Sequence, residues 1–135
     1  MNIEQLRQNE EGIGYLVVRV STARGAIPLE KASVSIRGGS PETSGIIYSL
    51  LTNQDGLTEK ISLPTPAASF SASPNNPTPY STWNVDVFKE GYTPISFTGV
   101  PVYPSVVSIQ PAVMIPIPQG FIYTESFNES KSPDL

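Results

Sequence analysis

The chain of 135 residues contains no cysteine and no histidine. The absence of cysteine excludes a disulfide framework and thiolate nucleophiles, and it is compatible with either a reducing or an extracellular compartment. Without histidine the chain also lacks the side chain that most often exchanges protons near neutral pH and most often binds metals. These two absences predict a protein that is not an enzyme, with no catalytic residues, no metal site and no cofactor.

Clustered positive charge and long apolar runs are absent as well. Eight lysines and arginines against twelve aspartates and glutamates give a net charge of -4, and the basic residues are scattered along the chain. Because nucleic-acid binding requires a concentrated positive field, no nucleic-acid partner is expected. No stretch reaches the roughly 18 apolar residues of a membrane-spanning helix, and the polar start of the chain does not resemble a secretory signal. We therefore expect cytoplasmic synthesis without membrane insertion.

What the sequence does contain is a repeated alternation of side chains typical of β-strands. Leu16, Val18 and Val20 occupy every second position of the first such segment, as expected for a strand with one buried face. In the fifth, Trp83 and the valines two and four residues later are expected to face inward. Seven segments are expected to form strands, at 15–21, 32–37, 46–52, 57–63, 83–87, 95–97 and 106–115, with apolar residues covered on both faces of the third. Residues 13–116 are therefore predicted to form one all-β sandwich domain.

Glycines and prolines separate the expected strands. At residues 53–56 we expect a hairpin turn in which Asp55 bonds its own backbone and Gly56 adopts a positive φ. Residues 64–80 contain five prolines, and they are expected to form a long loop because proline cannot donate to a sheet ladder. For the same reason Pro111 must lie at a sheet edge or in a bulge.

The two ends of the chain are expected to lie outside the sandwich. Residues 1–12 are predicted to form a polar N-terminal arm and residues 117–135 an extended C-terminal tail. The tail contains an apolar segment at 121–127. Two arrangements of this segment remain open, because it can add to an exposed sheet edge of a neighbouring molecule or fold back onto its own sandwich.

Five phrases of the sequence resemble the carboxypeptidase regulatory-like, or transthyretin-like, domains. They are GYLVVRV, GAIPLEKASVSI, TNQDGLTEKISLP, WNVDVFKEGY and VVSIQPAVMIP, with Pro28, Ala32, Val34, Thr52, Asp55-Gly56 and Gly91-Tyr92 as the most diagnostic positions. The resemblance implies a seven-stranded Greek-key β-sandwich. The family pattern usually has glycine where Lys31 stands. One enzymatic branch of this fold hydrolyses 5-hydroxyisourate with the help of histidines, which this chain lacks.

A narrower likeness concerns the segments LPTPAASFSASPNNPTPYSTWNVDV and GYTPISFTGVPVYPSVVSIQPAVMIP. They are similar to the non-catalytic N-terminal domains of clostridial spore-cortex peptidoglycan hydrolases, and to small stand-alone relatives in gut Firmicutes. This likeness implies a Gram-positive, spore- or envelope-associated setting and assigns no reaction.

Two candidate chemical sites have simpler structural interpretations. Lys31 and Glu59 are conceivable partners of an isopeptide crosslink, but two solvated charges on different strands are the preferred interpretation. Asn53, Asp55 and Glu59 offer oxygen ligands, yet Ca²⁺ takes six to eight oxygens. The turn at 53–56 accounts for these residues without a metal.

Tyr80 and Tyr103 are the predicted ligand-binding residues. Tyr80 stands at the end of the 64–80 loop and Tyr103 in the turn at 100–105, and exposed aromatic rings stack well on sugars or on proline-rich peptides. Trp83, which lies on an alternating strand, is expected in the core and not on a ligand platform.

These observations predict a non-enzymatic binding or assembly module. Its partner is expected to be a protein or glycan surface, contacted by the 64–80 loop and the 100–105 turn, and homo-oligomers through edge strands or tails are a further expectation. The alternative is a regulatory, pro-domain-like partner of a peptidoglycan hydrolase.

Overall fold

The computed structural model describes residues 11–67 and 79–118. Within these residues the chain forms eight β-strands and one 3-10 turn, η1 (Pro41–Thr43). The strands are β1 (Glu11–Thr22), β2 (Ile27–Pro28), β3 (Ser33–Gly38), β4 (Ile47–Leu51), β5 (Ile61–Pro66), β6 (Ser81–Phe88), β7 (Ile95–Val102) and β8 (Val107–Val113). No α-helix occurs in the described ranges, and the all-β prediction is confirmed for them.

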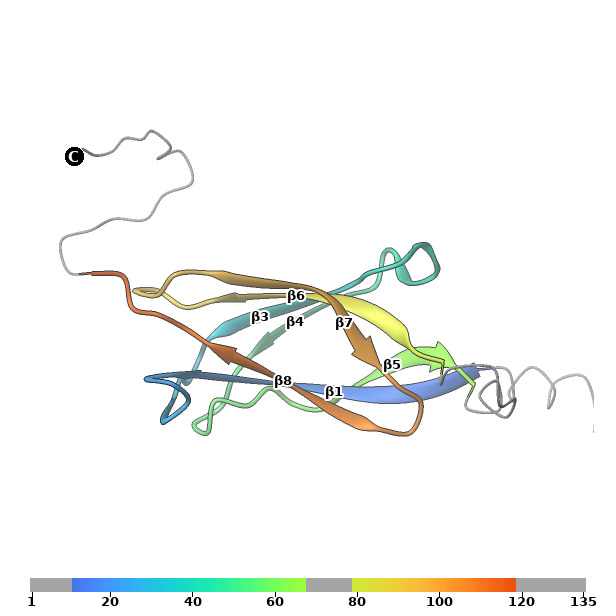
Figure 1. Cartoon of the computed structure of the whole chain (residues 1–135), viewed down its shortest axis with the longest axis horizontal. Coiled ribbons are helices and arrows are strands. Elements are labelled where there is room, and N and C mark those ends of the chain that lie inside the picture. The colour runs from blue at the N-terminus through green and yellow to red at the C-terminus, as the bar shows by residue number, and fades with distance from the viewer. Residues whose placement is uncertain (1–10, 68–78, 119–135) are drawn as a thin grey trace, which may run out of the picture.

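The strands form two four-stranded sheets, which Figure 1 shows as two layers. In sheet A, β1 pairs along one side with β2 and β5, both antiparallel, and along the other side with β8 in parallel. In sheet B the order is β4-β3-β6-β7, with every neighbouring pair antiparallel. The chain is therefore a β-sandwich, as the alternation predicted.

The hydrophobic core lies between the two sheets. Leu16, Val18 and Val20 of β1 are completely buried, and so is Trp83 of β6. Because successive strand residues point to opposite faces, the every-second-position pattern of the sequence maps directly onto the inner faces of both sheets. The predicted inward direction of these side chains is confirmed.

The predicted fourth strand at 57–63 is present with different limits, since β5 covers Ile61–Pro66 and shares only residues 61–63 with the prediction. Its last residues include Pro64 and Pro66, which were assigned to the loop at 64–80. Both prolines are tolerated because β5 pairs only with β1 among the described residues. In such an edge strand every second N–H points away from the ladder, and a missing donor there costs no hydrogen bond.

Other strand limits also differ from the expectation. The sixth strand was expected at 95–97, but β7 continues to Val102 and carries Pro101, again at a sheet edge. Pro111 lies in β8, whose partner in the described residues is β1 alone, so its predicted edge position is confirmed. The expected arm at 1–12 lies outside the described residues except for its last two residues, which belong to β1. The expected tail lies outside them from residue 119 on.

Only one face of β4 is covered, which corrects the expectation for segment 46–52. Tyr48 and Leu50 pack against the core. Ile47 and Leu51 point to the opposite face and are 64% and 65% exposed. When all large residues of a segment are apolar, the sequence contains no periodicity from which burial of a single face can be recognised.

The turn at 53–56 is built by Asn53. Its Oδ1 accepts hydrogen bonds from the N–H groups of Asp55 (2.8 Å) and Leu57 (3.0 Å), so the predicted role of Asp55 is wrong. Gly56 adopts φ +78°, as predicted. Beside this turn the buried hydroxyl of Thr52 accepts from the N–H of Ala32 (2.8 Å) and donates to the carbonyl of Leu29 (2.6 Å).

Replacing Thr52 with valine is expected to lower the free energy of unfolding by about 2–3 kcal/mol. The shape of the side chain is retained, but the buried groups of Ala32 and Leu29 lose their hydrogen-bond partner. Urea denaturation measures the loss, and Thr98→Val on the exposed face of β7 serves as the control, with a change within about 0.5 kcal/mol. Equal stabilities of the two variants would contradict the structural role of the Thr52 hydroxyl.

Candidate functional site

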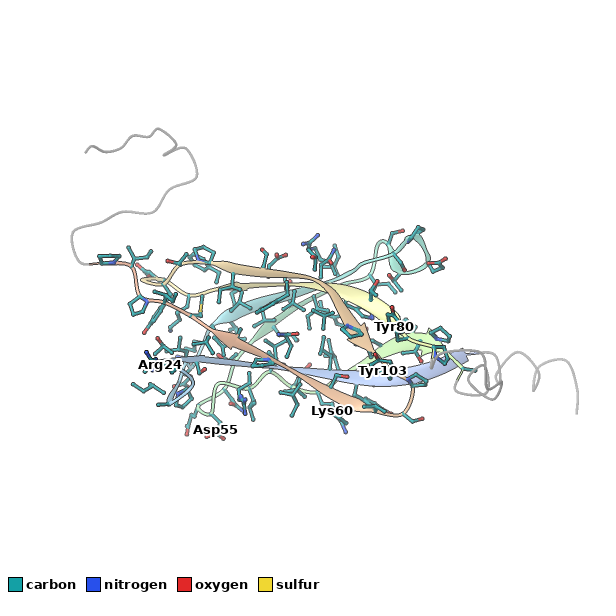
Figure 2. All side chains as sticks on the ribbon, viewed as in Figure 1. Arg24, Asp55, Lys60, Tyr80 and Tyr103 are labelled. Carbon is teal, nitrogen blue, oxygen red and sulfur yellow. The ribbon has the colours of Figure 1, made fainter. Side chains whose placement is uncertain are left out.

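Tyr80 and Tyr103 come together at one end of the sandwich. Tyr80 directly precedes β6 and Tyr103 directly follows β7, and these strands pair antiparallel with Ser81 opposite Val102. The two ring centroids are 5.4 Å apart, with an interplanar angle of 47°. Figure 2 shows both tyrosines close together, toward the end of the sandwich opposite Arg24. Tyr80 is 48% exposed and Tyr103 is half-buried.

Tyr103 is held in place by the crossing of its turn over β1. A Cβ at Gly14 would lie only 2.3 Å from the carbonyl oxygen of Tyr103, so only glycine permits this approach. The turn is also bonded to β1, because the N–H of Ser105 donates to the carbonyl of Ile13 (2.7 Å). The turn that carries Tyr103 is therefore fixed against β1, as a preorganised binding site requires.

A groove of about 540 Å³ opens beside Tyr80. Its lining combines hydroxyls, prolines, one aromatic ring and one carboxylate: Ser40, Glu42, Thr43, Pro64, Thr65, Pro66, Tyr80 and Ser81. Its volume falls within the usual range of ligand sites. Because the lining contains no lysine or arginine, the groove suits neutral polar groups and apolar faces better than phosphates or other anions.

The wall formed by η1 is fixed by one hydrogen bond to β6 and by another within the turn. The N–H of Gly39 donates to the carbonyl of Thr82 (2.9 Å), which ties this segment to β6. The Thr43 hydroxyl accepts from the N–H of Ser40 (3.2 Å). Sequence reasoning missed these groove residues, although the phrase Ser40-Pro41-Glu42-Thr43 is typical of the start of a helical turn.

Tyr103 lines a second, smaller hollow of about 310 Å³. The lining there is largely apolar and includes Val100, Pro101 and Ile109. Each ring of the tyrosine pair thus borders its own concavity. An extended ligand that crosses the pair would contact the hydroxyl-rich groove first and the apolar hollow second.

The remaining sequence candidates are placed elsewhere. Trp83 is fully buried and its Nε1–H donates to the Ser81 hydroxyl (2.8 Å), so its assignment to the core is confirmed. In the described part of the chain an ion pair joins Arg37 to Asp86 at 2.8 Å, and none joins Lys31 to Glu59. The ammonium of Lys60 lies 4.9 Å from the ring centroid of Tyr15.

Residues 11–67 and 79–118 contain no group of three or more aspartate and glutamate side chains that could hold a metal ion. In this part of the chain no helix has the length and apolar character that a membrane span needs.

No protein-family model and no curated protein matches the chain. Among solved structures, the crystal structure of chlorocatechol 1,2-dioxygenase from Pseudomonas putida is similar, with a TM-score of 0.52 and 14% sequence identity. The match covers 77% of this chain and 60% of the dioxygenase chain. At this level of identity the likeness shows a shared β-sandwich fold, and a fold alone assigns no activity.

Proposed function

We propose that this chain is a non-enzymatic binding module that contacts a glycan or protein surface through the Tyr80–Tyr103 end of the sandwich. The observation that carries the proposal is the contact between exposed Tyr80, which lines a groove with serine and threonine residues, and half-buried Tyr103, which lines the neighbouring hollow. Aromatic rings bury a large area at little entropic cost, and neighbouring hydroxyls supply directional hydrogen bonds.

A neutral glycan strand is the ligand we favour first. The groove presents Ser, Thr and Tyr hydroxyls and a single carboxylate, that of Glu42. Sugar hydroxyls form hydrogen bonds with such protein hydroxyls, and the C–H faces of a pyranose ring pack against tyrosine rings. The sequence likeness to domains of spore-cortex peptidoglycan hydrolases supports a spore or envelope setting, and oligomers of N-acetylglucosamine, the uncharged sugar of the peptidoglycan backbone, are the first probe.

The strand order supports the more specific fold proposal, a seven-stranded Greek-key sandwich of the transthyretin-like kind. Seven longer strands are divided between the sheets as β5-β1-β8 and β4-β3-β6-β7, and the two-residue β2 adds to this set. Lys31, where the family pattern usually has glycine, adopts φ +61°. A left-handed backbone at this position gives a physical reason for the family's glycine.

The binding test compares the wild type with the double variant Tyr80→Ala/Tyr103→Ala. Titration with N-acetylglucosamine oligomers, measured by calorimetry, is expected to show at least a tenfold weaker affinity for the double variant, because two stacking surfaces are removed. Phe88→Ala, which removes an exposed aromatic ring outside the groove, is the control and should bind like the wild type.

Unchanged affinity of the double variant would remove both tyrosines from the proposed site. Absence of glycan binding by the wild type would remove the glycan version of the proposal. If the wild type then altered the rate of a peptidoglycan hydrolase in a mixed assay, the alternative of a regulatory partner would replace it.

A further inference from the structure

The five edge segments of the two sheets differ in how they are protected against pairing with another chain. Natural sheets protect edges with prolines, charges or bulges. Within residues 11–67 and 79–118, four of the edge strands contain proline: β2 has Pro28, β5 has Pro64 and Pro66, β7 has Pro101 and β8 has Pro111. The fifth edge strand, β4, contains neither proline nor a charged residue.

Among the described residues, the backbone groups of β4 without a partner belong to Ile47, Ser49 and Leu51. The carbonyl of Ile46 accepts from the N–H of Gly38 on β3 (3.0 Å). Hydrogen-bonding direction alternates along a strand, so the even-numbered residues of β4 face β3. The odd-numbered residues therefore present their N–H and C=O groups to the open edge of sheet B.

We propose that β4 is a self-association edge, at which two copies of the chain pair antiparallel about a two-fold axis through Ser49. In this register Ser49 lies opposite its own counterpart, and Ile47 of each copy lies opposite Leu51 of the other. The free groups of these three residues then face one another as hydrogen-bonded pairs. The two four-stranded B sheets would join into one continuous sheet.

The side chains of this register are self-complementary, which argues for a second copy as the occupant. On the outer face, Ile47 (64% exposed) would pack against Leu51 (65% exposed) of the other copy, twice. On the inner face, Tyr48 would lie opposite Leu50 of the other copy, and both side chains are only partly buried in the single chain. Segment 46–52 carries no charge, so no like charges on β4 oppose each other across the axis.

The space beside β4 is consistent with an added strand. A hollow of about 630 Å³ lies along this edge, lined by Leu50 and Leu51 of β4 and by Leu57 and Glu59 across from it. An arriving strand would fill part of this space with its inward side chains. Because the paired edges contain only five residues each, the interface is small, and we expect a dissociation constant on the order of tens of micromolar.

Sedimentation equilibrium of the full chain tests the proposal. The wild type is expected to shift from monomer to dimer between about 5 and 500 µM, and Ile47→Lys/Leu51→Lys is expected to weaken dimerisation at least tenfold. Phe88→Lys is the matched control, because Phe88 is 55% exposed on the same outer face but lies on β6, away from the edge. A wild type that stays monomeric throughout, or a control that weakens dimerisation equally, would overturn the proposal.

A crosslinking experiment tests the register. Because the chain contains no cysteine, an introduced cysteine can form a disulfide only with its counterpart in another copy. In a hydrogen-bonded antiparallel pair the Cα atoms are about 5.5 Å apart, which is within the range bridged by a disulfide. Ser49→Cys is therefore expected to form covalent dimers on mild oxidation much faster than Ser62→Cys, an exposed serine on the edge strand β5. Equal rates would contradict the two-fold axis at Ser49.

Hydrogen exchange separates a second copy from other occupants of the edge. Amides of Ile47, Ser49 and Leu51 are expected to become protected as the protein concentration rises. Protection that does not depend on concentration would mean that a segment of the same chain covers β4, and fast exchange at all concentrations would mean that the edge is free. Both results would overturn self-association at β4.

Discussion

Replacing Trp83 with alanine is expected to lower the free energy of unfolding by about 3–5 kcal/mol. Trp83 is the largest fully buried side chain of the described residues and lies on β6, in the middle of sheet B. Its removal leaves a cavity between the sheets and also deprives the Ser81 hydroxyl of the indole donor. Domains of this size are commonly stable by only about 5–15 kcal/mol, so the variant would lose a large part of its stability.

The measurement is urea denaturation followed by far-ultraviolet circular dichroism, because Trp83 is the only tryptophan and its fluorescence disappears with the substitution. Phe88→Ala is the control on the same strand. Phe88 is 55% exposed, and its truncation is expected to cost less than about 1 kcal/mol. Similar losses for the two variants would be incompatible with a core centred on Trp83.

Replacing Gly56 with alanine is expected to cost about 2–4 kcal/mol, the second largest effect. Gly56 adopts φ +78°, which strains any residue with a Cβ. In addition, a Cβ there would lie 2.3 Å from the carbonyl oxygen of Val20. The carbonyl of Gly56 accepts from the N–H of Val20 (2.7 Å), so the same displacement would disturb the attachment of the 53–56 turn to β1.

Alanine variants of two other glycines separate the two causes of the expected loss of stability, the strain of a positive φ and the steric contact of the new Cβ. Gly45 and Gly91 have φ near +90°, and nothing lies within 4 Å of a Cβ at either position. Their alanine variants are expected to lose about 1 kcal/mol each, the strain contribution alone. Urea denaturation of the three variants measures their free energies of unfolding. If Gly56→Ala were no less stable than these two, the close packing of the turn against β1 would be disproved.

The prolines show where reasoning from the sequence was incomplete. Proline lacks an N–H, and on that ground Pro64 and Pro66 were assigned to a loop. The rule holds only where the N–H is needed, and at the outer side of β5 it is not. For Pro111 the same rule predicts an edge or a bulge, and the edge position is confirmed because β8 pairs only with β1 among the described residues. Whether a strand lies at an edge depends on its neighbours in space, which local sequence does not specify.

The binding site was accessible to sequence reasoning only in part. Tyr80 and Tyr103 were selected one by one as exposed aromatic residues beside turns, and their stacking at 5.4 Å follows from the antiparallel pairing of β6 with β7. The groove required η1 and the end of β5 as well, because η1 connects two strands of sheet B and β5 lies in sheet A.

The sequence by itself determined which side chains of most strands face the core, because the two-residue repeat of a strand is a local property of the backbone. It also determined the position of the positive φ at Gly56, where a tight turn needs glycine. Tertiary structure decided which strands became edges, why Ile47 and Leu51 remain exposed, and that two tyrosines distant in the sequence contact each other, each beside its own concavity. These features depend on contacts between segments distant along the chain, and such contacts are settled only when the two sheets pack together.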